Sequence, residues 1–114
     1  MATGLRIAFV APADDCVPSR VDHPTGNGIK ALADALVARG HAVLVCAPIP
    51  SHSDARVVGT VGYRGNSPLG SDVTFAHLTR AATAVERFRP DVTHDFTGHF
   101  GLLDTGEEYL SFEL

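Results

Sequence analysis

The sequence predicts an α/β fold in a single domain, with a parallel β-sheet and helices on both faces. Two observations lead to this prediction. Short apolar runs at 6–11 and 41–47 flank a segment with helical periodicity, and two buried strands around an amphipathic helix imply parallel strands joined by a crossover. The chain has 114 residues, of which 45% are hydrophobic, so it has the material for one core and one domain.

The first strand is expected over 6–11, because this short apolar run contains β-branched residues and ends at Pro12. Residues 12–27 are rich in proline, aspartate and glycine and predict a long loop. Loops of this length are often functional.

A helix is expected over 28–39. One apolar stripe recurs there at i, i+3, i+4, i+7 and i+8, formed by Ile29, Leu32, Ala33, Leu36 and Val37. Asn27 is expected to cap the start of this helix, and Gly40 to adopt the left-handed conformation after its end. Gly40 alone separates the helix from the second strand, 41–47, which Pro48 ends.

The second half of the chain carries weaker patterns. A strand is expected near 56–61, and glycines predict a loop over 62–71. A helix is expected over 72–89, where Pro90 must end it, with Phe75, Leu78, Ala82, Val85 and Phe88 on its buried side. A short strand at 91–94 follows. No further strand is expected, so the sheet is predicted to be incomplete at one edge. Residues 1–100 form the predicted domain, and 101–114 an acidic tail that a truncated reading frame would explain.

Composition argues against nucleic-acid-binding, disulfide-rich and transmembrane proteins. Nine Lys and Arg against thirteen Asp and Glu give a net charge of −4, which argues against a nucleic-acid partner. Cys16 and Cys46 do not form a C-x-x-C pair, so a reduced, cytoplasmic protein without a disulfide framework is expected. No apolar run is long enough to predict a transmembrane segment.

One glycine motif could face a ligand. Gly26-Asn27-Gly28-Ile-Lys-Ala31 matches the pattern G-x-G-x-x-A at the start of a helix, where backbone N–H groups can receive an anion. A dinucleotide site would need this motif directly after the first strand and an acidic residue after the second, and neither condition holds. Two interpretations stay open: the turn receives an anionic or hydroxyl-rich ligand, or its glycines only lead the chain into the helix.

Three other groups of residues are candidates for metal binding or catalysis. Asp14 and Asp15 follow the first strand as in magnesium-dependent receiver domains, but the chain lacks a convincing acceptor aspartate and its only lysine is Lys30, so a solvated loop is expected. The histidines lack the paired spacing of metal ligands, so no metal or other cofactor is expected. Cys16 has no basic neighbour in sequence, which argues against thiol catalysis.

His94 ends the predicted strand 91–94, and His99 follows in the next loop. Ligands of open α/β sheets bind beyond the carboxyl ends of the strands. A histidine there could act as a general base or hold a sugar hydroxyl, or its ring could simply be hydrogen-bonded within the loop.

Three stretches in this order resemble a known family. They are Arg6-Ile-Ala-Phe-Val-Ala-Pro12, the segment from Gly26 through Ala-Arg-Gly-His to Ala47, and Arg89-Pro-Asp-Val-Thr-His-Asp95. Together they resemble the N-terminal, acceptor-side domain of family-4 glycosyltransferases, which are retaining enzymes of the GT-B type with two Rossmann-like domains. The resemblance covers residues 6–99, and over 48–88 it is a likeness of pattern only.

The resemblance implies a site at the cleft between two domains. Gly26, Asn27, Gly28 and His99 would contact substrate, and His94 would act on the transferred sugar. The partners would be a nucleotide-sugar donor and a sugar or other small acceptor, once a second domain carrying an E-x7-E motif completes the site. The chain alone is therefore expected to be inactive. Phe96 stands where the family has a second histidine, which favours the alternative of a non-catalytic binding module. A receiver-like or nucleotide-binding domain is the third, less favoured hypothesis.

Overall fold

The computed structural model describes residues 4–65, 70–98 and 109–111, the last three as backbone. It contains two helices and five strands in the order β1 Arg6–Val10, α1 Pro24–Ala38, β2 Ala42–Ile49, β3 Arg56–Gly62, α2 Ser71–Phe88, β4 Val92–Asp95 and β5 Tyr109–Ser111.

The five strands form one parallel sheet. Their order is β3-β2-β1-β4-β5, and each pair of neighbours runs in the same direction. At the centre of the sheet Phe9 of β1 lies opposite Val45 of β2 and His94 of β4. This strand order is that of Rossmann-like folds, so the predicted α/β class is confirmed.

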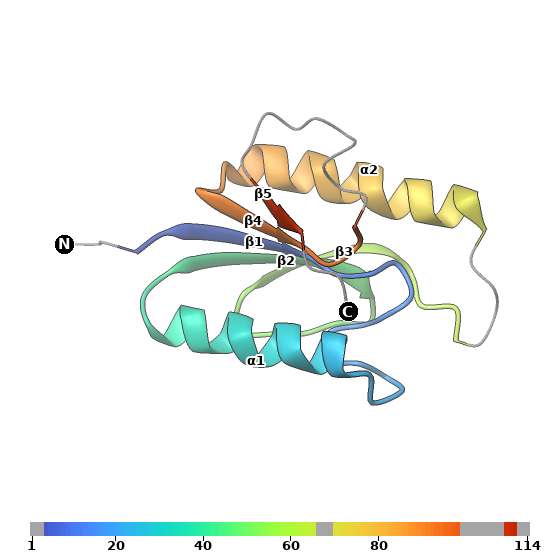
Figure 1. The fold of residues 1–114 in the computed structure, drawn as a ribbon, viewed down its shortest axis with the longest axis horizontal. Coiled ribbons are helices and arrows are strands. Elements are labelled where there is room, and N and C mark those ends of the chain that lie inside the picture. Colours follow the sequence, from blue (N-terminus) through green and yellow to red (C-terminus); the bar gives the residue numbers. More distant parts are fainter. Residues whose placement is uncertain (1–3, 66–69, 99–108, 112–114) are drawn as a thin grey trace.

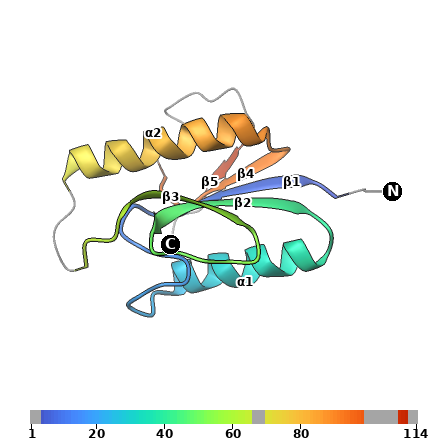
Figure 2. The ribbon, with the colours of Figure 1, turned by 180° about the vertical axis from the view of Figure 1, so that it is seen from behind.

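The helices cover opposite faces of the sheet, as Figure 1 and the reverse view in Figure 2 show. On the α1 side, Ile29 and Ala33 pack against inward-facing residues of β1 and β2 such as Phe9. On the α2 side, Leu78 and Val85 pack against the alternate residues of the same strands. Strands covered on both faces need apolar residues at every position, which is why β1 and β2 are continuous apolar runs.

Helix α1 begins earlier than the sequence predicts. It starts at Pro24, with His23 at the N-cap position and no side-chain cap, so the prediction that Asn27 caps the helix is wrong. Proline suits the first turn of a helix because its missing N–H would have no intrahelical partner. Pro24 therefore starts the helix instead of belonging to the loop that precedes it. The left-handed Gly40 is confirmed, with φ of 92°.

Two predicted core residues are exposed. Leu32 on α1 is 43% exposed and Phe75 on α2 is 62% exposed, so both assignments to the buried stripe are wrong. Each helix buries a narrower arc against the sheet than its apolar pattern suggests. On α2 the inward position in that turn belongs to His77, which is fully buried.

The sheet also continues beyond β4. The backbone of Tyr109–Ser111 pairs in parallel with β4, so the prediction of no further strand after 91–94 needs correction. Three residues give too little pattern for recognition from sequence. The rest of the predicted acidic tail, 101–108 and 112–114, lies outside the described residues.

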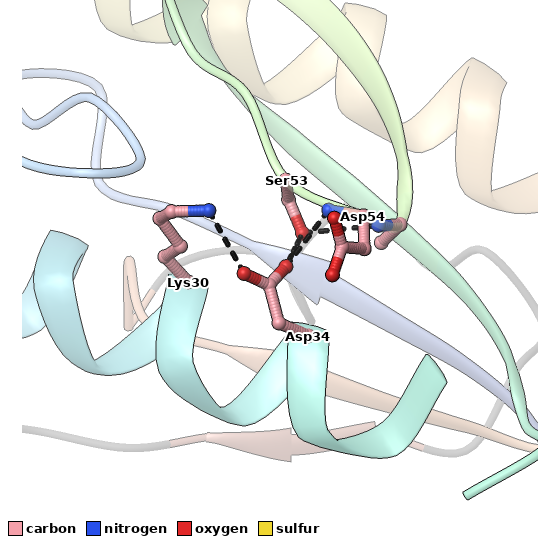
Figure 3. A network of polar contacts seen from close by, with 5 residues as sticks. Lys30, Asp34, Ser53 and Asp54 are labelled. Atoms are coloured by element: carbon pink, nitrogen blue, oxygen red, sulfur yellow. Dashed lines mark hydrogen bonds and ion pairs between the residues drawn. The ribbon is translucent and has the colours of Figure 1, made fainter. Parts of the chain in front are cut away.

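A polar network fixes α1 to the loop before β3 (Figure 3). Asp34 of α1 accepts hydrogen bonds from Lys30 Nζ at 2.8 Å, from the Ser53 hydroxyl at 2.5 Å and from the Asp54 N–H at 2.8 Å. Partial burial acts to raise the pKa of Asp34, but the bonds from Lys30 and Ser53 outweigh it and lower that pKa to about 2. The network therefore joins the helix to the chain entering the edge strand.

Candidate functional site

A crevice lies at the carboxyl ends of β1 and β4. These neighbours are the point where the strand order reverses, because the chain leaves β1 for β2 on one side and returns to β4 on the other. Ligands of open α/β sheets bind at this point. The cavity has a volume of about 200 Å³ and is lined by residues after β1, residues after β4 and the first half of α2: Pro12, Ala13, Asp14, Thr74, His77, Leu78, Phe96 and Thr97.

His77 fixes the wall of this crevice. Its Nε2 lies 2.6 Å from the Ala11 carbonyl and its Nδ1 lies 2.5 Å from the Thr60 hydroxyl. A carbonyl only accepts, so Nε2 carries the proton and the Thr60 hydroxyl donates to Nδ1. Burial lowers the pKa of His77 against the opposing effects of the Ala11 bond and of Asp95 and Asp14, so the ring is held neutral.

The turn after β4 is held by a buried carboxylate. Asp95 is fully buried, and its Oδ1 accepts hydrogen bonds from the Thr97 backbone at 2.7 Å and from the Thr97 hydroxyl at 2.6 Å. The Phe96 N–H donates to the Val10 carbonyl at 3.0 Å and continues the ladder between the two strands. These bonds fix Thr97 against the crevice, opposite the exposed Asp14.

The glycine turn is packed against the protein's own loop. The Gly26 N–H donates to Asp15 Oδ2 at 2.9 Å, and a Cβ at this position would overlap the carbonyl of Cys16. Asp15 is 3% exposed, so the prediction of a solvated loop is wrong for this residue. Its Oδ1 has no hydrogen-bond partner within the described part of the chain. Gly28 differs, because nothing lies within 4 Å of the Cβ it would carry.

Asn27 organises the loop before the helix. Its Oδ1 accepts a hydrogen bond from the Ser19 N–H at 3.1 Å, and its Nδ2 donates to Asp22 Oδ1 at 3.0 Å. Asp22 has a φ of 58°, a left-handed conformation that aspartate adopts more readily than most residues. The predicted contact of Asn27 with a substrate would thus involve a side chain that is already hydrogen-bonded to Ser19 and Asp22 of the loop.

His94 lies on the α1 side of the sheet. Its ring stacks on Phe9 with 5.0 Å between centroids and 16° between planes, and Phe9 belongs to the core packed by α1. Phe96 stacks on the same ring of Phe9 at 6.3 Å. Burial lowers the pKa of His94, so the neutral ring is favoured. His94 is not among the residues that line the crevice, and His99 lies outside the described residues.

Neither cysteine has the character of a reactive thiolate. Cys16 and Cys46 are both free and fully buried. Burial raises the pKa of both thiols, that of Cys46 to about 12. Within residues 4–65 and 70–98, no three His, Cys, Asp or Glu side chains come together as a metal site would require.

No protein-family model and no curated protein matches this sequence. Of the described helices, neither α1 nor α2 is long and apolar enough to cross a membrane.

Sequence reasoning missed two residues of the site region. The spacing of His77 excludes it as a metal ligand and predicts no other role. Its place on the inward side of an amphipathic helix is the sequence signal of a buried ring with two hydrogen bonds. The pair Asp14 and Asp15 predicts a solvated loop. The apolar residues Cys16 and Val17, which follow Asp15 directly and are fully buried, are the sequence signal that part of the loop turns inward.

Proposed function

We propose that this chain is the acceptor-side domain of a sugar-transferring enzyme, and that the crevice between β1, β4 and α2 binds a hydroxyl-rich acceptor. The observation that carries the proposal is the position and lining of the crevice at the reversal of strand order. The order of the three sequence stretches that resemble family-4 glycosyltransferases supports the same assignment.

The lining suits a sugar. The exposed carboxylate of Asp14 can accept hydrogen bonds from ring hydroxyls, and the hydroxyls of Thr74 and Thr97 lie on the same cavity. Leu78 supplies apolar surface for the C–H faces of the ring, whereas the Phe96 ring stacks on Phe9 on the α1 side. A small number of fixed polar groups in a largely apolar wall is the usual composition of a small-molecule site.

The donor's phosphate is assigned to the second domain. In the first turn of α1, the Gly26 N–H already donates to the Asp15 carboxylate, and Pro24 has no N–H to offer. A buried carboxylate repels a second anion. The sequence predicts that the donor sugar approaches Gly28 and that His94 acts on it. Both residues lie on the α1 side of the sheet and neither lines the crevice, so the crevice is proposed as the acceptor site alone.

The alternative is a non-catalytic binding module. Phe96 favours it, because this residue stands at the position of the family's second histidine and packs against the α1-side core. Such a module would bind ligand in the same crevice without transferring sugar.

The first test is an NMR titration of the ¹⁵N-labelled chain with glucose and with UDP-glucose. We expect glucose to shift the amides of 13–14, 74–78 and 96–98, and Asp14→Ala to weaken binding about tenfold, as loss of a charged hydrogen-bond partner does. Asp54→Ala is the matched control, because it removes an exposed carboxylate far from the cavity lining. Absence of shifts at these amides at 50 mM glucose would reject the crevice as the acceptor site.

A second test distinguishes the domain of a sugar-transferring enzyme from the non-catalytic binding module. Sequencing the gene beyond codon 114 should find a continuation that encodes a second Rossmann-like domain with an E-x7-E motif. A stop codon there, together with glucose binding in the crevice, would favour the binding module. Turnover of a nucleotide-sugar by the 114-residue chain alone would contradict the requirement for a second domain.

A further inference from the structure

A second hollow lies on the α2 side of the sheet, between edge strand β3 and the C-terminal half of α2. It has a volume of about 210 Å³, and its base is apolar, formed by Leu44, Val58, Ala84 and Phe88. Its rim carries the side chains of Arg56 from β3 and of Arg80 and Arg87 from α2. We call this hollow the arginine groove. It shares no lining residue with the crevice described above.

No carboxylate of the described residues neutralises the positive charge of the arginine groove. No Asp or Glu within 4–65 and 70–98 lines it, and the only ion pair within these residues is Lys30–Asp34, in which both partners belong to α1. Three of the nine basic residues of an otherwise acidic chain thus gather on one groove. Guanidinium groups held together without a counterion repel one another, and a bound anion relieves that repulsion.

The three arginines line the same hollow. Arg80 and Arg87 are seven residues apart, which places them on the same side of α2 about 10 Å apart along the axis, with the small residues Thr83 and Ala84 between them. Arg56 faces them from β3. Arg80 Nη1 donates to the Thr60 carbonyl at 2.6 Å, so this side chain is oriented while its other N–H groups remain for a ligand.

The carbonyl at the C-terminal end of α2 is bound by a different arginine, Arg6. Arg6 of β1 donates to the Phe88 carbonyl from Nε at 3.0 Å and from Nη2 at 2.6 Å, and its guanidinium lies 4.2 Å from the centre of the Phe88 ring. The negative end of the helix therefore has its own cation. Arg56, Arg80 and Arg87 are additional to it.

We propose that the arginine groove binds the phosphate group of a small phosphorylated molecule. A phosphate monoester has three acceptor oxygens and about two negative charges, which match several planar guanidinium donors, whereas a carboxylate offers two oxygens and one charge. The net charge of −4 disfavours a long polyanion such as nucleic acid, because its other phosphates would meet an acidic surface. This site is independent of the acceptor crevice.

The test is isothermal titration calorimetry of the full chain with inorganic phosphate at low ionic strength. We expect one saturable site, with Arg56→Gln and Arg87→Gln each weakening binding about tenfold or more. Arg39→Gln is the matched control, because it removes an exposed arginine just after α1, outside the groove. Far-UV circular dichroism of each variant establishes that it is folded. No saturable binding at 20 mM phosphate, or equal weakening by the control, would overturn the proposal.

A second measurement needs no variant. Phosphate should protect Arg56, Arg80 and Arg87 of the wild-type chain from modification by phenylglyoxal, as followed by peptide mass spectrometry, while Arg39 stays as reactive as before. Uniform protection of all four would mean nonspecific screening and contradict the site. A hexaglutamate peptide that binds more tightly than phosphate would point to an acidic protein segment and also overturn the proposal.

Discussion

Replacement of Gly26 by alanine should destabilise the protein, whereas the same replacement at Gly28 should stabilise it. Both glycines lie in the first turns of α1, and alanine is favoured over glycine within a helix by about 1 kcal/mol. Gly28 is exposed with open space around it, so Gly28→Ala should raise the free energy of unfolding by about 0.5–1 kcal/mol.

At Gly26 the same methyl group meets the chain. A Cβ there would overlap the Cys16 carbonyl and lie 3.0 Å from both Asp15 Oδ2 and the Ser19 nitrogen, so the loop must move away from the helix. Such overpacking costs about 1–3 kcal/mol, and loss of the bond from Gly26 N–H to the Asp15 carboxylate adds about 1.5–3 kcal/mol. After the gain of about 1 kcal/mol in helix propensity, a net loss of about 1.5–5 kcal/mol is expected.

Urea denaturation followed by circular dichroism measures both changes. With a slope of about 1–3 kcal/mol per molar urea, the two variants should differ in midpoint by roughly 1 M or more. A Gly26→Ala protein as stable as the wild type would refute the reasoning. It would mean that the loop adapts freely and that the motif is not needed for packing.

Three further predictions concern buried polar groups. His77→Leu leaves the Ala11 carbonyl and the Thr60 hydroxyl without their partner and should cost about 2–4 kcal/mol in urea denaturation. Because the folded pKa of His77 lies below the ordinary 6.5, the unfolding free energy of the wild type should fall as pH decreases below 6.5, and His77→Leu should reduce that fall. Asp34→Asn should cost about 1 kcal/mol of unfolding free energy at pH 7. The wild-type carboxylate has a pKa of about 2 against an ordinary 3.8, so the wild type loses stability as the pH falls from 3.8 to about 2, and Asp34→Asn should reduce that loss. Asp15→Ala should cost about 1.5–3 kcal/mol, because the Gly26 N–H loses its charged acceptor, and Asp15→Asn should cost less, because an amide oxygen can still accept from Gly26. Equal losses for the two Asp15 variants would contradict this role of Asp15. An unchanged pH profile in His77→Leu or Asp34→Asn would contradict the assignments of those residues.

Most of the fold follows from the sequence because its central elements are periodic. Residues 7–10 of β1 and all residues of β2 are apolar, as strands covered on both faces must be, and the charged Arg6 stands at the exposed start of β1. Pro90 and Gly40 end the two helices as expected. The start of α1 was missed because Pro24 fits both a loop and a first helical turn, and only the packing of Gly26 on the loop distinguishes them.

The site was harder to predict because its residues are defined by contacts across long separations. His77 meets Ala11, which is 66 residues away, and Asp15 meets Gly26 across the loop after β1. No local pattern specifies such pairs. The candidates taken from sequence, Gly26 to Gly28 and His94, lie on the α1 side of the sheet, whereas the crevice opens on the α2 side. Their roles in binding and catalysis stay predictions.

The bonds of His77 also have a consequence for the edge of the sheet. Edge strands usually fray, and their amide hydrogens exchange with solvent sooner than those of central strands. Release of Thr60 from its place in β3 would leave the imidazole nitrogen buried without a partner, and the same ring holds the end of central strand β1. The amides around Thr60 are therefore expected to exchange together with those of β1, so that β3 behaves as part of the most protected unit of the protein.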